Sequence, residues 1–314
     1  MIKILCPDPK SFSNAGLNFA HQYSELVAKK LSQKEFYRCS GEYDALLIRF
    51  NNKIGEEFFG NSSKVKAIIS PTTGLDHIDL DAARSHNVKV FHLRGQKRFL
   101  KGISGTAELT IGLMLALVRK IPQSFESVKD ERWDPGPYRG NEISGKVMGV
   151  IGCGRLGSKV ARTAVALGMK VLAYDPFLNR FPSKVSKINE LSELLRKSDV
   201  ITLHVPLVSE TRHLIGLKEV HQMKDGVFII NTSRGAILSS KALLLGLKSE
   251  KIKAAALDVL ENEHSILTSS HELIDYANNY DNLLITPHIG GATYESVEKT
   301  DLFILKKFFK SIKE

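Results

Sequence analysis

The sequence has little of what marks secreted, metal-binding or membrane-spanning proteins. It has three cysteines, Cys6, Cys39 and Cys153, in 314 residues. Because they are odd in number and widely spaced, they fit neither a disulfide framework nor a zinc cluster. The longest apolar run, Leu109 to Val118, has ten residues, against the roughly 20 that a membrane helix needs, and MIKILCPD turns polar too early for a signal peptide. We expect no metal, no membrane segment and a reducing cytoplasm.

Acidic residues are scarce relative to basic ones. Lys and Arg number 44 against 34 Asp and Glu, a formal net charge of +10, which favours anionic ligands by long-range steering. The stretch LRGQKRFLKGIS carries Arg94, Lys97, Arg98 and Lys101 without one acid. However, no nucleic-acid motif is present, and aromatic residues do not alternate with the basic ones as a stacking platform requires. We therefore do not expect nucleic acid to be the partner.

Length and an apolar content of 43% predict a large core and about two domains. Short β-rich runs alternate with helical patterns, which predicts an α/β fold with parallel strands and helical crossovers. The expected strands are Ile2 to Leu5, Ala45 to Arg49, Lys66 to Ser70, Val88 to His92, Lys146 to Ile151, Lys170 to Tyr174, Val200 to His204, Val227 to Asn231, Ala254 to Leu257 and Leu283 to Thr286.

One small sheet cannot hold so many strands, and the alternation breaks after Ser104. There a long helical pattern runs from Glu108 to Lys120 and continues past Pro122. A final amphipathic pattern, Ser296 to Ile312, predicts a helix that packs back on the first sheet. We therefore expect a first domain of residues 1–104 plus 290–314 and a second of residues 105–289.

The clearest motif lies where an apolar run meets Gly152, Gly154 and Gly157 before a helical pattern. In a dinucleotide-binding fold these glycines make the tight turn, admit the pyrophosphate and allow close helix packing. The helix N-terminus then faces the phosphates. Asp175 ends the next strand and would accept both ribose hydroxyls while repelling a 2′-phosphate, which favours NAD over NADP. The alternative is that Asp175 merely caps a turn with Pro176.

Three later strand ends carry side chains capable of catalysis. Arg234 follows IINTS, Asp258 and Glu263 lie in ALDVLENE, and His288 lies in TPHIGG. Ligands of open α/β sheets bind outside the carboxyl ends of the strands, so these side chains could converge on one cleft. Taken singly, Arg234 could be a surface cation, Asp258 a helix cap and Glu263 one of a solvated pair with Glu261.

Several segments together resemble one family. VIGCGRLG, HVPL, INTSRGAIL, ALDVLENE and TPHIGGAT, with TTGLDHIDLDAA earlier, resemble the D-isomer-specific 2-hydroxyacid dehydrogenases, which include 3-phosphoglycerate dehydrogenases, glycerate dehydrogenases and hydroxypyruvate reductases. The resemblance covers about Lys66 to Thr293. It implies two doubly wound parallel-sheet domains: a Rossmann domain that binds NAD, and a flavodoxin-like domain, with a 2-hydroxy or 2-oxo acid bound between them.

The resemblance also implies catalytic roles for Arg234, Glu263 and His288. Arg234 would bind the substrate carboxylate and polarise the 2-oxo group with its planar charged fork. His288 would be the general acid and base, which suits a side chain whose ordinary pKa, about 6.5, lies near working pH. Glu263 would hydrogen-bond His288 and hold its orientation.

Further residues follow from the same resemblance. Main-chain N–H groups around Thr73 and Gly74 would take the substrate carboxylate from the first domain. Asp258 would face the nicotinamide carboxamide. The implied cofactor-binding set is Gly152, Gly154, Arg155, Leu156, Gly157, Asp175, His204, Val205, Pro206, Thr232, Ser233, Asp258, Gly290, Gly291 and Thr106.

Two positions depart from the family pattern. His264 stands where a proline commonly follows the catalytic glutamate, and His92 to Gly95 replaces the usual Asn-x-Pro-Gly, followed by a loop longer than usual. The second change leaves the basic stretch open to two interpretations. It is either a solvated connector, or Arg94, Lys97 or Arg98 contacts a second anionic group on the substrate, as in 3-phosphoglycerate.

Two other functions remain open, an NAD-binding corepressor-like scaffold and a phosphite-type dehydrogenase. Formate dehydrogenases carry Gln where this chain has Glu263, which counts against that activity. The helix after Ser104 is more apolar than a one-sided surface helix should be. With Trp133 and its proline-rich neighbours, it suggests the arm of a homodimer.

Overall fold

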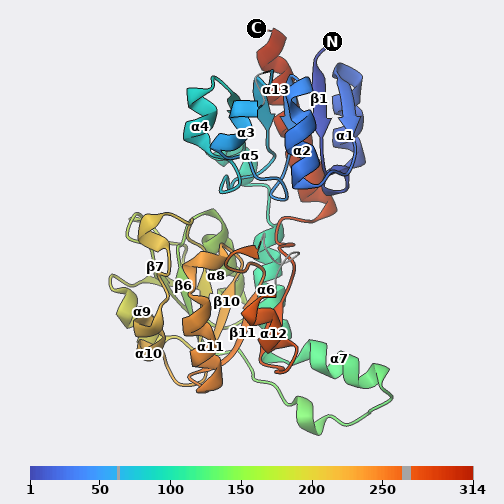
Figure 1. Cartoon of the computed structure of the whole chain (residues 1–314). Helices are drawn as coiled ribbons and strands as arrows, with labels where there is room; N and C mark the ends of the chain where they lie inside the picture. Colours follow the sequence, from blue (N-terminus) through green and yellow to red (C-terminus); the bar gives the residue numbers. More distant parts are fainter. Residues whose placement is uncertain (62–63, 264–269, 314) are drawn as a thin grey trace. The chain divides into compact units, whose positions relative to one another are not determined.

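The computed structural model describes residues 1–61, 64–263 and 270–313. It divides into two compact units (Figure 1). Unit 1 comprises residues 1–103 and 292–314, and unit 2 comprises residues 104–291. His264, one of the two departures from the family pattern, lies outside the described residues.

Unit 1 is a parallel sheet in the order β2-β1-β3-β4-β5, with helices on both faces. Its strands are β1 (Lys3–Cys6), β2 (Glu25–Ala28), β3 (Ala45–Leu47), β4 (Ala67–Ile69) and β5 (Lys89–Phe91). Its helices are α1 (Asn14–Tyr23), α2 (Gln33–Cys39), α3 (Glu56–Asn61), α4 (Leu80–Ser85), α5 (Lys97–Leu100) and α13 (Tyr294–Lys313). Side chains alternate between two apolar clusters, one on each face, because successive strand residues point to opposite sides.

Unit 2 is a larger parallel sheet in the order β12-β11-β10-β9-β6-β7-β8. Its strands are β6 (Val147–Ile151), β7 (Lys170–Tyr174), β8 (Val185–Lys187), β9 (Val200–Leu203), β10 (Val227–Asn231), β11 (Ile252–Leu257) and β12 (Leu283–Ile285). Its helices are α6 (Gly105–Val118), α7 (Ile121–Lys129), α8 (Arg155–Ala166), α9 (Leu191–Lys197), α10 (Leu217–Gln222), α11 (Ser240–Lys248) and α12 (Glu272–Ala277). The strand order reverses between β6 and β9, the switch point of a Rossmann fold, where dinucleotides bind.

The predicted pair of parallel sheets is confirmed, and each expected run overlaps a strand. Two strands, β2 and β8, were not expected. Both lie at the edge of a sheet and leave residues partly or fully exposed. They therefore lack the continuous apolar run that marks a strand buried on both faces.

The long helical pattern after Ser104 forms two helices rather than one. Lys120 adopts a left-handed conformation, with φ of 54°, between α6 and α7. Pro122 lies in the first turn of α7, where its missing N–H removes no helical hydrogen bond; inside a continuous helix its ring would clash with the preceding turn.

One stretch, Lys97–Val118, is long and apolar enough to cross a membrane by length and composition alone, which the count of consecutive apolar residues did not indicate. Within it, α6 contacts α8, β10 and β11 of unit 2. Leu113, Met114 and Leu117 are buried in an apolar cluster of that unit. These contacts bury part of α6 in the core of unit 2.

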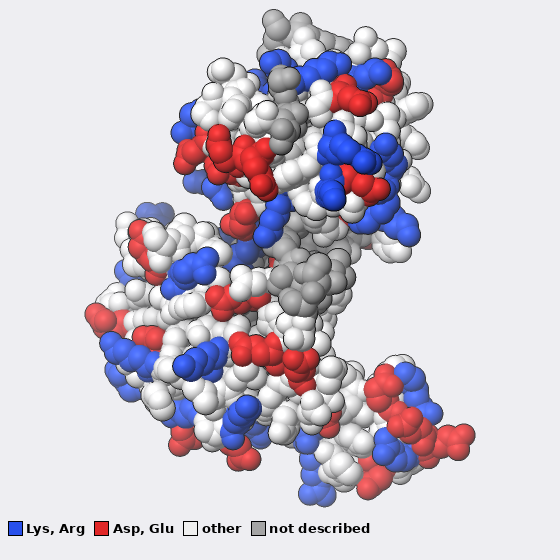
Figure 2. Space-filling view, viewed as in Figure 1, with Lys and Arg blue, Asp and Glu red and all other residues white. Residues whose placement is uncertain are grey.

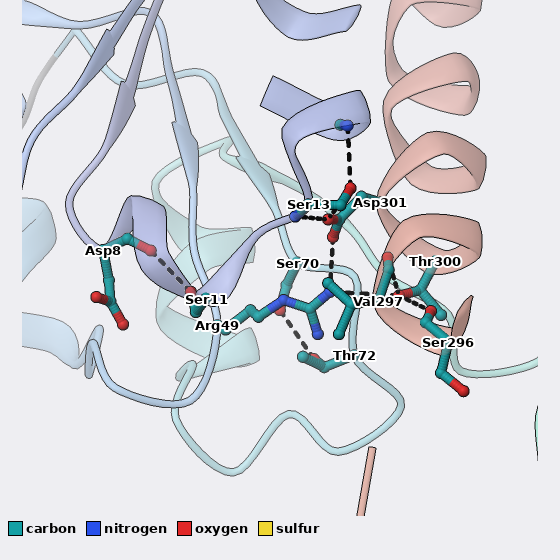
Figure 3. Close-up of polar contacts among 11 residues, drawn as sticks. Asp8, Ser11, Ser13, Arg49, Ser70, Thr72, Ser296, Val297, Thr300 and Asp301 are labelled. Carbon is teal, nitrogen blue, oxygen red and sulfur yellow. Dashed lines mark hydrogen bonds and ion pairs between the residues drawn. The ribbon is translucent and has the colours of Figure 1, made fainter. Parts of the chain in front are cut away.

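The C-terminal helix α13 packs on unit 1, as predicted. It contacts β4 and β5, and Ile304, Leu305 and Phe308 are buried against that sheet. Asp301, also on α13, has a fully buried side chain. Its Oδ1 accepts from Arg49 Nη2 at 2.6 Å, and its Oδ2 accepts from the N–H and Oγ of Ser13 at 2.8 and 2.9 Å (Figure 3). This cluster joins α13 to the end of β3 and the start of α1.

Candidate active site

The glycine-rich turn after β6 has the shape of a phosphate cradle. Gly152 has φ of 86°, a conformation that favours glycine. A Cβ on Gly157 would lie 2.0 Å from the Gly152 carbonyl oxygen, so only glycine lets α8 approach the strand this closely. Gly154 is exposed with open space around it, and α8 begins at the next residue, Arg155, with no acid in its first turn. These features fit a dinucleotide pyrophosphate at the N-terminus of α8.

Asp175 lies directly against this turn. Its Oδ2 accepts from the Cys153 N–H at 2.9 Å, and its Oδ1 accepts from the Phe177 N–H at 3.1 Å. The two interpretations of Asp175 are therefore compatible, because it caps its own turn and also stands beside the glycines. Burial, assisted by Asp175, raises the pKa of the Cys153 thiol to about 11, which suits a small packing residue rather than a reactive thiolate.

His204 follows β9, beside the switch point. Its Nε2 lies 2.9 Å from Thr202 Oγ1, and burial lowers the pKa of His204 to about 4, so the ring is neutral at pH 7. Val205 is half-buried and Pro206 is exposed. A neutral ring next to an accessible turn is compatible with the place that the resemblance gives His204, Val205 and Pro206 in the cofactor-binding set.

The turn that carries Arg234 is braced by Asn231, the last residue of β10. Asn231 Oδ1 accepts from the N–H and Oγ of Ser233 at 3.0 and 2.7 Å, and its Nδ2 donates to the Arg234 carbonyl at 2.9 Å. Thr232 is buried and lies 2.8 Å from Thr110 on α6, oxygen to oxygen. The sequence did not lead us to Asn231 or Thr110. A buried amide ending an apolar strand was the available signal for Asn231.

Asp258 is buried and holds the turn that carries His288. Its Oδ1 accepts from Thr286 Oγ1 at 2.6 Å and from the Ile289 N–H at 2.8 Å, and its Oδ2 accepts from the Gly290 N–H at 2.7 Å. Burial raises the pKa of Asp258, against the opposing effect of these donors. His288 itself has φ of 55°, an uncommon backbone conformation for a residue other than glycine. Asp258 therefore has a structural task that the resemblance did not indicate.

Glu263 and His288 meet directly. Glu263 Oε1 lies 2.7 Å from His288 Nδ1, and Glu263 Oε2 accepts from the Leu260 N–H at 3.3 Å. Both side chains are about a quarter exposed, so a ligand can reach them. With Nδ1 held by the carboxylate, proton exchange with a ligand falls to Nε2.

The other predicted glycines border this region. A Cβ on Gly290 would lie 2.9 Å from Asp258 Oδ2 and 3.1 Å from Thr106 Cγ2, whereas Gly291 has open space around it. The candidate residues of unit 2 thus lie after the carboxyl ends of neighbouring strands in one parallel sheet. Asp175 follows β7, His204 follows β9, Thr232 follows β10, Asp258 follows β11 and His288 comes after β12.

The candidate substrate-binding residues of unit 1 are Thr73 and Gly74. Thr73 is exposed and Gly74 half-buried in the segment after β4, where Thr72 Oγ1 donates to the Gly74 carbonyl at 2.8 Å. In residues 1–61, 64–263 and 270–313, no group of three or more Cys, His, Asp or Glu could hold a metal ion.

The basic stretch packs on unit 1 through its apolar side chains. Leu93 and Leu100 are buried, and the Phe99 ring stacks on Phe303 of α13 with centroids 3.9 Å apart. Its basic residues, Arg94, Lys97, Arg98 and Lys101, are exposed. Figure 2 shows basic and acidic side chains interspersed over the visible face of each unit, not one continuous basic surface.

Comparison with known proteins agrees with this geometry. Residues 111–290 match the family model described as D-isomer specific 2-hydroxyacid dehydrogenase, NAD binding domain. The chain is 34% identical to a D-3-phosphoglycerate dehydrogenase of Methanocaldococcus jannaschii, over 100% of this chain and 58% of that protein. It is 35% identical to a hydroxypyruvate reductase of Thermotoga maritima, over 92% of this chain and 91% of that protein.

The chain thus spans little more than half of the first relative but nearly all of the second. Among solved structures, a D-lactate dehydrogenase from Aquifex aeolicus complexed with NAD and lactic acid has a TM-score of 0.83 at 29% identity, covering 99% of this chain and 95% of that one. The family model covers more than half of the sequence and the reductase shares more than 30% identity. The chain belongs to the D-isomer specific 2-hydroxyacid dehydrogenases.

Proposed function

We propose that the protein is an NAD-dependent oxidoreductase that interconverts a D-2-hydroxy acid and its 2-oxo acid. The observation that carries this proposal is the 2.7 Å contact between Glu263 and His288. Both residues lie at the carboxyl ends of the strands of unit 2, as do Arg234 and the glycine-rich turn. Family membership, with relatives named as dehydrogenases and reductases, supports it. The same comparisons give no support to a corepressor-like scaffold or a phosphite-type dehydrogenase.

The proposed mechanism assigns one task to each of three side chains. Arg234 binds the carboxylate of the 2-oxo acid and polarises its oxo group with two donors in a fixed plane. His288 delivers the proton to that oxygen during reduction and removes it during oxidation. Glu263 holds His288 through Nδ1, so that the ring presents Nε2 to the substrate. NAD, when bound, supplies the chemistry of hydride transfer at C2.

The cofactor would be held by the residues that fit it in unit 2. Gly154, Arg155 and Leu156 would offer main-chain groups to the pyrophosphate, and Asp175 would accept hydrogen bonds from the ribose hydroxyls. Thr232 and Ser233 would border the nicotinamide ribose. The resemblance assigns the carboxamide to Asp258, whose buried side chain accepts hydrogen bonds from Thr286, Ile289 and Gly290.

The chemical group that the substrate carries beyond its 2-oxo acid end has to be considered separately. Relatives are named for 3-phosphoglycerate, hydroxypyruvate, aromatic 2-oxo acids and glyoxylate, so similarity favours no single compound. We propose that main-chain groups near Thr73 and Gly74 take the carboxylate, and that Arg94, Lys97 or Arg98 favours a substrate with a second anion. Their exposure leaves these side chains accessible to a charged ligand.

A panel of 2-oxo acids, monitored by loss of NADH absorbance, tests the activity and this preference together. We expect turnover of at least one acid, and a lower KM for a doubly anionic acid than for a simple one of similar size. Replacing Arg94, Lys97 and Arg98 by Gln should raise KM for the doubly anionic acid alone. Equal effects on both classes would remove the basic stretch from the site, and no turnover of any acid would contradict the proposed reaction.

We further propose a homodimer formed through α7 and the segment after it. Figure 1 shows this part extending away from the rest of unit 2. It carries Ile121, Phe125, Val128 and Trp133, which are 51%, 61%, 50% and 87% exposed. Exposed apolar residues gathered on one projecting element mark an association surface.

Sedimentation should therefore give about twice the chain mass of 34.9 kDa. Phe125→Asp should yield a monomer, because burying an unpaired carboxylate in an apolar interface is costly. The exposed Leu167→Asp on the end of α8 is a matched control that should remain dimeric. A wild-type protein that sediments as a monomer at micromolar concentration would contradict the assignment.

A further inference from the structure

Three chain segments of unit 2 meet beside Glu263. The segment before α10 is joined to the segment after Arg234 by backbone hydrogen bonds. The His213 N–H donates to the Ala236 carbonyl at 2.7 Å, and the Ile215 N–H donates to the Ile237 carbonyl at 3.1 Å. The third segment is the loop from Asp258 to Glu263, which follows β11.

Gly235 brings the Arg234 turn into direct contact with this loop. A Cβ on Gly235 would lie 2.0 Å from the Leu260 carbonyl carbon and 2.3 Å from the Glu261 nitrogen. No side chain fits there without moving backbone. Since the Leu260 N–H donates to Glu263 Oε2, the position of this loop fixes the position of the Glu263 carboxylate.

Glu261 ties the loop to its surroundings through both side chain and main chain. Its Oε1 lies 2.7 Å from His213 Nε2 and 3.8 Å from Arg212 Nη1, and its Oε2 accepts from Ser240 Oγ at 3.4 Å. The Glu261 carbonyl accepts from His271 Nε2 at 2.8 Å. The Glu261 side chain is 19% exposed and that of His213 is 45% exposed.

We propose that Glu261 is a positioning residue for the reaction, acting through Glu263. Its contact with His213, called here the Glu261 bridge, holds the loop against the Arg234 turn and keeps Glu263 within hydrogen-bonding distance of His288. This inference rests on the proposed function. It also gives Glu261 a role, whereas the sequence suggested only that Glu261 and Glu263 form a solvated pair.

The size of the expected effects separates positioning from structural support. A side-chain contact in which one partner, His213, is 45% exposed contributes little to the stability of the fold. A displacement of about 1 Å at a catalytic group, in contrast, can lower a rate by roughly 100-fold. Loss of the bridge should therefore appear in kcat and leave the melting temperature nearly unchanged.

Glu261→Gln and Glu261→Ala are the variants to compare with wild type. We expect kcat to fall by about 10-fold or more, with KM and NADH affinity changed less than about 2-fold, because the affected group acts on proton transfer. His213→Ala should reproduce the loss, and His213→Gln, which keeps an N–H donor, should restore much of it. Glu250→Gln, at an exposed acid after α11, is the matched control and should behave as wild type.

A double-variant cycle shows whether Glu261 acts through Glu263. In a Glu263→Gln background, Glu261→Gln should cause little further loss, since the group that it positions is already altered. A full and independent loss in that background would overturn the proposal. Wild-type kcat in both Glu261 variants, or a lowered melting temperature with unchanged kcat, would overturn it as well.

The proton resonance of His288 Nδ1 gives a readout that does not need turnover. In wild type and Glu250→Gln it should show the hydrogen bond to Glu263, and in Glu261→Ala it should shift or broaden. If wild type reduced no 2-oxo acid, the proposed function would fail. This resonance would still show whether the Glu261 bridge holds Glu263 against His288. An unchanged resonance in Glu261→Ala would contradict it.

Discussion

Replacing His288 by alanine is expected to lower kcat for 2-oxo acid reduction by roughly 100- to 10,000-fold, the usual contribution of a positioned general acid. The proton for the developing hydroxyl would then have to come from water. NADH affinity should change little, because the glycine-rich turn and Asp175 lie on other strands of the sheet. Steady-state rates and fluorescence titration with NADH measure the two quantities.

His221→Ala is the control for this substitution. His221 is exposed on α10, so its loss removes the same side chain without touching the candidate site. Rates of the control should match wild type. If His288→Ala turned over at the wild-type rate, His288 would not be the proton donor.

Replacing Asp301 by alanine is expected to destabilise unit 1 by about 3–5 kcal/mol, the usual cost of removing one partner of a buried ion pair. The substitution leaves the Arg49 guanidinium, whose side chain is only 14% exposed, without its carboxylate. It also removes the acceptor for the Ser13 N–H. The midpoint of urea unfolding, followed by circular dichroism, should fall accordingly.

Glu193→Ala is the matched control, since Glu193 pairs with Lys197 on the surface of α9 at 2.6 Å. We expect a change below about 0.5 kcal/mol there, as is typical of exposed helical pairs. The double variant Arg49→Met with Asp301→Ala should be less destabilised than the sum of its single variants, because no unpaired charge then remains. If the free-energy changes of the two single variants simply added up in the double variant, Arg49 and Asp301 would not stabilise each other.

The features that could be predicted from sequence are those formed by residues that follow one another closely in the chain. A strand, three glycines, a helix and an acid at the next strand end are consecutive in the chain, so Gly152, Gly157 and Asp175 could be placed from spacing alone. Arg234, Glu263 and His288 could be grouped because each follows a strand of one parallel sheet. Their assignment to roles came from resemblance to a family, and the structure adds the contact between Glu263 and His288.

The features that escaped prediction depend on distant contacts. Arg49 and Asp301 are 252 positions apart, and His213 and Glu261 are 48 apart, so no local pattern connects them. β8 is mostly exposed at a sheet edge, where neither face demands the apolar residues that would reveal it. The structural task of Asp258, in addition to its expected place facing the cofactor, depends on three donors from a turn about 30 residues later.

Transfer of deuterium from C4-labelled NADH to a 2-oxo acid tests the proposed reaction most directly. With an acid accepted in the panel, one of the two C4-labelled forms of NADH should yield a D-2-hydroxy acid with deuterium at C2, and His288→Ala should yield almost none in the same time. Mass spectrometry and chiral chromatography read the two properties of the product. A product without label from either form would contradict direct hydride transfer at this site, and an L-product would contradict the proposed D-configuration.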